Sequence, residues 1–167
     1  FAGYCIHSAV YIARPDAMVV THTHTRATVA VSAMECGLLP LSQHSLSPLF
    51  SLAYHDYEGP ANDLAERESL AAHLGDKMNM ILKNHGTLCV GRTIPECFEL
   101  TYYLDTSCQI QVDVMASGQV SEIPPEIVAE GHRQYKKRFD TGQKGQRTWE
   151  ALRRRLGNHH AARLGQE

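Results

Sequence analysis

Short apolar segments alternate with longer amphipathic segments along most of the chain, and this alternation limits the folds that are open to it. The pattern predicts strands at residues 17–21, 38–41, 52–54, 78–82 and 87–90. It predicts helices at residues 5–13, 26–34, 64–74, 93–115 and 123–139. Strands interleaved with helices are typical of a layered α/β domain, and 167 residues suit one such domain.

Local signals set the expected ends of these elements. Gly37 fits the C-cap of the helix at 26–34, and Thr93 with Glu96 forms a capping-box pattern at the start of a long helix. Residues 42–50, which contain three Ser and one Pro, are expected to be a loop. From residue 141 the chain is polar and basic, with a short helix expected at 149–156. We therefore predict one domain at residues 1–140 and a tail at 141–167.

The main functional signal is the triplet His22-Thr23-His24, which follows the apolar strand at 17–21. In an extended strand, residues two apart point the same way, so the two imidazoles can face one point. In a chain with ten His, such a doublet can also be a plain surface pair. Its place at the end of a strand, just before a helix, favours a ligand site, because α/β proteins tend to bind ligands there.

His85 has a similar setting, in the turn Asn84-His85-Gly86 between two apolar segments. Three His ligands with an open position describe a catalytic metal site, whereas structural sites usually have four protein ligands. The sequence therefore predicts that His22, His24 and His85 bind one divalent ion. Zn²⁺, Fe²⁺, Mn²⁺, Co²⁺ or Ni²⁺ would accept this ligand set, and ligand type alone does not choose among them. Asn84, Thr23 or backbone carbonyls are candidates to orient the rings.

Composition excludes several classes of partner. The formal net charge is −2, so we expect no general affinity for nucleic acid or anionic membranes. No apolar run approaches the roughly 20 residues of a membrane span, and no signal peptide is visible. The five cysteines form no CxxC pair, which favours a reducing, cytoplasmic compartment. The chain begins Phe-Ala-Gly-Tyr without Met, so we expect an N-terminal segment of the protein to be missing.

These motifs and the intervals between them resemble the class II aldolase/adducin family over about residues 3–117. The shared features are the Arg-Pro-Asp block at 14–16, the His-x-His at 22–24, Asn-His-Gly at 84–86, and Gly91. The resemblance implies a three-layer α/β domain with a central, largely antiparallel sheet, and a homo-oligomer, usually a tetramer. It also implies that His22, His24 and His85 hold a catalytic zinc, which stabilises an enolate of a small-molecule substrate.

The sequence departs from the family's aldolases at the proton-transfer groups. Those enzymes carry a Glu nineteen residues before the first His of the motif, and here that position is Gly3. Their phosphate-binding segment lies upstream of this chain. His44 lies in the region where those enzymes have their acid Tyr. It is either a catalytic acid or base, or a loop residue that faces solvent. His7 is expected to be a packed core residue rather than a ligand, and Tyr54, His55 and Tyr57 either line the pocket or have structural roles.

Three functions remain open from the sequence. The first is a metal-dependent lyase acting on a small hydroxy-carbonyl or keto acid. The segments at 24–27, 37–43 and 54–60 resemble a branch of aldolase-like proteins whose substrate is unknown. A related branch contains non-haem iron oxygenases of aryl-pyruvate-type substrates. A third, the adducin head, is a binding module without known chemistry, for which three metal ligands would have no use.

Overall fold

A four-stranded mixed sheet forms the centre of the domain. In this computed structural model, residues 2–59, 65–142 and 144–164 are described. The strands are β1 (Val19–Thr23), β2 (Leu52–His55), β3 (Asn79–Leu82) and β4 (Gly86–Gly91), in the spatial order β1-β4-β3-β2. β4 is antiparallel to both β1 and β3, and only β2 and β3 are parallel. The expected α/β class with a largely antiparallel sheet is therefore confirmed.

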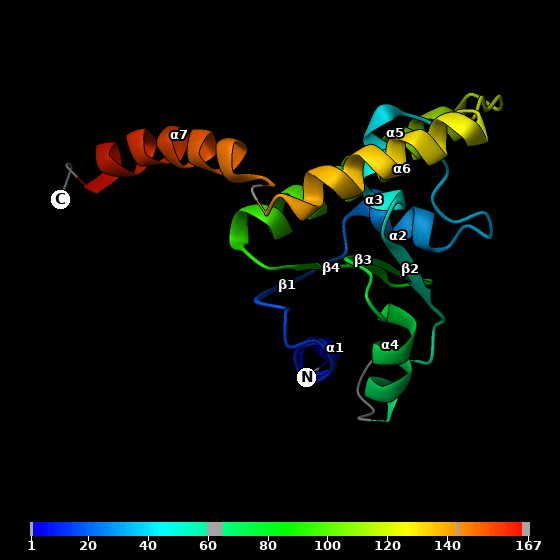
Figure 1. Cartoon of the computed structure of the whole chain (residues 1–167), viewed down its shortest axis with the longest axis horizontal. Coiled ribbons are helices and arrows are strands. Elements are labelled where there is room, and N and C mark those ends of the chain that lie inside the picture. The colour runs from blue at the N-terminus through cyan, green and yellow to red at the C-terminus, as the bar shows by residue number, and fades with distance from the viewer. Residues whose placement is uncertain (1, 60–64, 143, 165–167) are drawn as a thin grey trace.

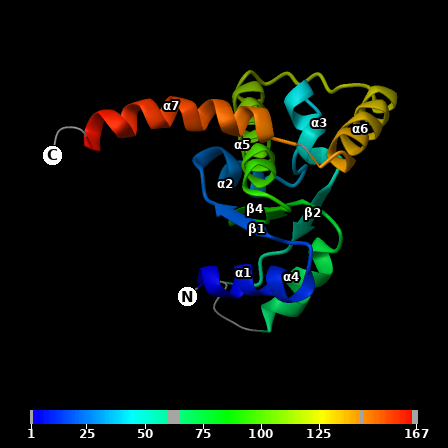
Figure 2. The ribbon, with the colours of Figure 1, turned by 60° about the vertical axis from the view of Figure 1, so that its left-hand side comes forward.

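Helices cover both faces of the sheet, which gives three layers (Figures 1 and 2). One face carries α1 (Ala2–Ala13) and α4 (Glu66–Leu74), and the other carries α2 (Arg26–Ser32) and the long α5 (Ile94–Ala116). Outside α5 lie α3 (Gln43–Leu49) and α6 (Pro125–Asp140), which also contact each other. The last helix, α7 (Gln146–Leu164), extends away from the body and is longer than expected. The expected start of α4 at Leu64 lies outside the described residues.

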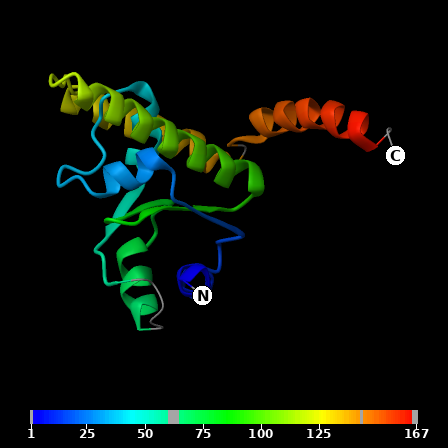
Figure 3. The same cartoon turned by 180° about the vertical axis from the view of Figure 1, so that it is seen from behind.

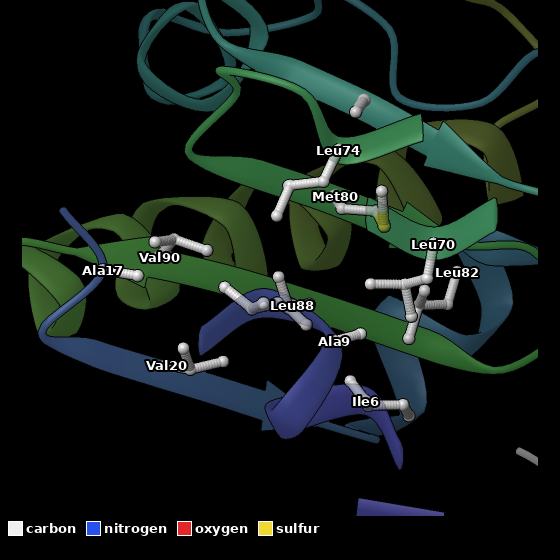
Figure 4. Packing of buried hydrophobic residues seen from close by; sticks show 12 residues of the cluster. Ile6, Ala9, Ala17, Val20, Leu70, Leu74, Met80, Leu82, Leu88 and Val90 are labelled. Carbon is white, nitrogen blue, oxygen red and sulfur yellow. The ribbon is translucent and has the colours of Figure 1, made fainter. Parts of the chain in front are cut away.

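Alternation along the strands divides the core in two. On β4, Leu88 and Val90 face α1 and α4, whereas Cys89 between them faces α5. Figure 4 shows the first cluster, in which Ile6 and Ala9 of α1 pack over the sheet. Leu88 is 0% exposed, and full burial of such a side chain stabilises the fold by about 1.5–3 kcal/mol. The period of two therefore assigns each strand residue to one helix layer.

Three local predictions were wrong. Residues 38–41 do not form a strand, because side chains take the backbone N–H groups that a strand would use: Leu38 N–H donates to Tyr54 Oη at 3.0 Å and Leu39 N–H to Gln111 Oε1 at 2.7 Å. Residues 42–50 are not a loop but contain α3, which a reciprocal cap between Ser42 and Ser45 begins. Gly37 caps no helix; it follows α2 in a left-handed turn, with φ of 63°.

The Arg-Pro-Asp block links the helix layer of α1 and α4 to the sheet. Both Nε and Nη2 of Arg14 donate to the Asp16 carboxylate, at 2.8 and 2.7 Å. The remaining nitrogen, Nη1, donates to the carbonyls of Gly75 and Lys77, both at 2.9 Å, between α4 and β3. A bidentate guanidinium with further carbonyl partners is a rigid clamp. This block therefore holds the segment between α1 and β1 against the end of α4.

The long helix α5 begins as expected, with one difference. The Thr93 hydroxyl accepts from Glu96 N–H at 3.3 Å, which confirms the cap. The Glu96 carboxylate reaches past Thr93 to Arg92, accepting from its backbone N–H at 3.0 Å and from its guanidinium at 2.8 Å. Among the described residues, no helix combines the length and apolar character that a membrane crossing needs.

Candidate metal centre

The His-x-His motif straddles the end of β1. His22 lies within the strand, opposite Leu88 of β4, and His24 follows the last strand residue. His22 has the same parity as Val20, which packs in the cluster under α1. Period-two alternation therefore directs the His22 side chain to the face of the sheet that carries α1 and α4. His22 is half-buried and His24 is exposed, so the motif meets solvent at the edge of the domain.

The turn between β3 and β4 brings His85 to the same edge. Asn84 adopts a left-handed conformation with φ of 56°, and its N–H donates to the Ser32 carbonyl at 3.0 Å. His85 N–H closes the turn on the Leu82 carbonyl, also at 3.0 Å. A Cβ on Gly86 would meet the Thr23 carbonyl oxygen below van der Waals contact and the His24 Cδ2 at 3.0 Å. Gly86 thus permits the close approach that sets His85 beside His24.

Three imidazoles converge as a result. Ligand nitrogens of His22, His24 and His85 lie within 4.8 Å of one another, and the ring centroids are 4.3, 4.9 and 4.8 Å apart. Nitrogens bound tetrahedrally to one ion at about 2.0–2.1 Å lie about 3.3 Å apart. Side-chain rotations that move these nitrogens by about 1 Å would bring them to this spacing, and the three side chains are exposed or half-buried. The donor set therefore fits a divalent ion with room for a further ligand.

Hydrogen bonding and burial prepare His22 to act as a ligand. Its Nδ1–H donates to the Thr87 carbonyl at 2.9 Å, which leaves the Nε2 lone pair free. A backbone carbonyl thus orients this ring, whereas the Thr23 hydroxyl bonds the Thr87 hydroxyl at 3.0 Å. Burial lowers the pKa of His22 to about 4, and burial with a charge on His24 also lowers that of His85. Both rings are therefore neutral near pH 7, as metal ligands must be.

Acid should destabilise the metal-free protein through His22. Unfolded, this ring takes up a proton near its ordinary pKa of 6.5, but folded only near 4. The unfolded state binds more protons between these values, so the free energy of unfolding should fall as pH drops through this window. Above pH 6.5 the contribution is constant. Urea unfolding of chelator-treated protein at several pH values measures this slope. A His22→Gln variant should show a shallower slope, and equal slopes would contradict the assignment.

Gly3 and His7 lie on α1, on the same side of the sheet as His22. A Cβ on Gly3 would meet nothing within 4 Å, so the position is open space. His7 follows Gly3 by about one helical turn and therefore lies on the same helix face. His7 is half-buried, and a charge on it would lower the pKa of His22, so the two rings lie within electrostatic range.

His44 on α3 and Tyr54 on β2 lie on the other side of the sheet from His22. His44 is exposed on α3, with its ring 5.7 Å from that of Tyr103 on α5. The structure does not bring it to the three histidines, and a catalytic role for it stays a prediction. Tyr54 has a structural contact, because its hydroxyl accepts from Leu38 N–H and its ring covers Gly37. Tyr57 is exposed beyond β2.

A second polar cluster, at the end of β2, was only partly expected. His55 is buried, its Nδ1 lies 2.8 Å from Nδ1 of His73 on α4, and its Nε2 lies 3.4 Å from Glu66 Oε1. A charge on His55 would lower the pKa of His85, so this cluster is a neighbour of the three histidines of the candidate metal site. Glu66 and His73 are seven residues apart, two turns of one helix face, and this spacing was the available sequence signal.

Comparison with known proteins places these residues in a family. The family model for the Class II Aldolase and Adducin N-terminal domain matches residues 2–112. A Caulobacter vibrioides protein, classed by name with the class 2 aldolases, is 52% identical over 118 residues, covering 71% of this chain and 46% of its own. Alpha-adducin of Mus musculus is 49% identical over 117 residues, covering 70% of this chain but 16% of its own. The chain thus spans about half or less of these relatives.

Solved structures with the same fold include named aldolases. An aldolase II superfamily protein from Pseudomonas syringae superposes with a TM-score of 0.84 at 42% identity, covering 95% of this chain and 63% of that one. An L-fuculose 1-phosphate aldolase from Glaciozyma antarctica superposes with a TM-score of 0.67 at 28% identity, covering 85% and 58%. The three-layer fold is therefore shared with proteins of both names.

Proposed function

The chain belongs to the class II aldolase and adducin family, and we propose that it is a metal-dependent lyase for a small hydroxy-carbonyl or keto-acid substrate. The observation that carries this proposal is the convergence of His22, His24 and His85, with His22 held by Thr87. A divalent ion bound there, Zn²⁺ in the first place, would stabilise negative charge on a carbonyl oxygen of the substrate.

Proton transfer needs a group other than the family's Glu. In an aldol cleavage the bond between the α- and β-carbons breaks and its electron pair stays on the α-carbon. The β-hydroxyl loses its proton as it becomes a carbonyl, and the α-carbon gains one. Gly3 can move neither proton. We assign this role to His7, because it lies one turn along the same face of α1 and within electrostatic range of His22.

Replacing His7 tests this assignment. His7→Gln should lower kcat by about 10²–10⁴-fold, the range for loss of a general acid or base. Metal content should stay unchanged, because His7 is not among the three ligands. Steady-state kinetics over a pH series, with metal analysis of the same samples, measures both. A variant that keeps wild-type kcat and pH profile would remove His7 from the mechanism.

The reaction class can be tested with defined metals. Protein loaded with Zn²⁺ is incubated without O₂ with a panel of β-hydroxy carbonyl compounds and keto acids, and release of an aldehyde or pyruvate is measured. Activity that disappears in a triple variant with alanine at 22, 24 and 85 supports the lyase. If O₂ is consumed with Fe²⁺ and an aryl-pyruvate, and no fragment is released without O₂, the lyase proposal fails and the chain is an iron oxygenase.

A non-catalytic binding module is the second candidate, since alpha-adducin of Mus musculus is 49% identical over 117 residues. It would be supported if the triple alanine variant kept every cellular function of the protein. We further propose a cytoplasmic homotetramer with no nucleic-acid or membrane partner. All five cysteines are free, which agrees with a reducing compartment.

A further inference from the structure

The base of α7 is fixed firmly to the body of the domain. Lys144, which precedes the helix, is 5% exposed, and its Nζ donates to Ser47 Oγ of α3 at 3.2 Å. The next residue, Gly145, presses so closely on the Pro95 carbonyl that a Cβ would collide with it. Trp149, in the first turn of α7, packs on Phe98 of α5, with ring centroids 5.5 Å apart. The body therefore sets the direction in which α7 leaves.

Beyond this base, α7 projects as an arm (Figures 1 and 3). Trp149, Leu152 and Leu156 are spaced by three and four residues, so they form one apolar stripe along the helix. Trp149 and Leu152 are half-buried, whereas Leu156 is 67% exposed. The stripe thus continues past the point where the chain's own α5 covers it.

An incomplete stripe of the same kind runs along α5. Ile94, Phe98 and Tyr102 follow each other at intervals of four residues on one face of this helix. Phe98 packs on Trp149, and the ring of Tyr102 contacts that of its neighbour Tyr103, with centroids 5.4 Å apart. Ile94 is 54% exposed and Tyr102 is 53% exposed. Each of the two helices therefore presents apolar surface that the single chain leaves open.

The charges of these two helices are opposite. Between Gln146 and Leu164, α7 has five Arg and one Glu, a net charge of +4. α5 has four acidic residues and no Lys or Arg; Glu96 and Glu99 are buried, so its acidic groups at the surface are Asp105 and Asp113. Residues 1–145 together have 11 Lys and Arg against 16 Asp and Glu, a net charge of −5. A basic arm and an acidic body in one chain are complementary when two copies meet.

We infer that the arm formed by α7 docks on α5 of a second copy of this chain. Leu152 and Leu156 of the arm lie against the stripe of Ile94 and Tyr102 in the second copy. Arg153, which flanks the apolar stripe of the arm, faces α5 of the second copy, where Asp113 is exposed. Because each copy has one arm and one acceptor face, exchange in both directions gives a closed two-fold contact. This surface is separate from the three histidines and does not depend on the proposed function.

Light scattering and sedimentation of the full chain over a concentration series test the docking. The wild type should associate, and Leu156→Asp should weaken self-association at least tenfold, shifting the mass toward the 18.6 kDa of one chain. Ala151→Asp is the matched control, since it places the same charge on the opposite, exposed face of α7. It should leave the association unchanged. Circular dichroism and metal content should be the same in all three proteins.

Two outcomes would overturn the inference. One is equal self-association of the wild type and Leu156→Asp, which would place the contact elsewhere. The other is a wild type that stays monomeric at every concentration. If that monomer bound vesicles of anionic lipid, and Arg153→Glu abolished the binding, the arm would serve a membrane surface instead. In contrast, Arg153→Glu should weaken docking to a second copy and reduce its salt dependence.

Discussion

Replacing His85 with alanine should cost the chain most of its affinity for a divalent ion while leaving the fold in place. Of the three imidazoles, His85 comes from a different segment from His22 and His24, so its loss removes one side of the site. Loss of a residue that merely orients a ligand costs about 10–100-fold in affinity, and loss of a ligand should exceed this. The half-buried ring adds little to the core, whose neighbouring residues Leu82 and Leu88 remain.

Metal analysis and competition with a chelator measure this loss, and thermal unfolding of the metal-free proteins checks the fold. His44→Ala is the matched control, because it removes an exposed imidazole from the other helix layer. Its metal content should equal that of the wild type. Unchanged affinity in His85→Ala would mean that the convergence of the three rings has no role in metal binding, and the lyase proposal would then lose its main support.

The parts of this site that could be predicted from sequence depend on local rules. Strand periodicity places His22 and His24 on one side of β1, and the Asn-His-Gly signal places His85 in a tight turn. Local rules also found nearly every helix and strand, because apolar periodicity and capping patterns act within a few residues. The antiparallel pairing that brings the turn beside β1 came from the family resemblance rather than from these rules.

Features that depend on distant partners could not be predicted. Segment 38–41 has the apolar composition of a strand, but Gln111, some seventy residues later, takes the Leu39 N–H. The Thr87 carbonyl that orients His22 and the carboxylate of Glu66 beside His55 are likewise contacts between separate elements. Residue type and spacing identify such groups as polar, but only the packed structure says which of them meet. The groups that hydrogen-bond to the site residues are therefore harder to predict than the metal ligands themselves.

Gly86→Ala should weaken metal binding at least tenfold although it changes no ligand. The new methyl group would overlap the Thr23 carbonyl oxygen, which belongs to the backbone of β1 and cannot rotate away, and would press on the His24 ring. The turn must then move away from β1, and His85 moves with it. Coordination tolerates errors of only about 0.2 Å, so a small shift separates His85 from the other two rings. Overpacking of this kind should also cost about 1–3 kcal/mol of stability.

Chelator competition gives the affinity of this variant, and urea unfolding gives its stability. Gly157→Ala is the matched control, because a Cβ there would meet nothing within 4 Å and α7 lies far along the chain from the three ligands. It should keep wild-type affinity and, as a helical Gly-to-Ala change, should be neutral or slightly stabilising. If Gly86→Ala lost stability but bound metal as tightly as the wild type, the close approach of the turn to β1 would serve packing alone. Loss of affinity in Gly86→Ala and in His85→Ala, but not in the controls, would show that backbone spacing and ligand identity both define the site.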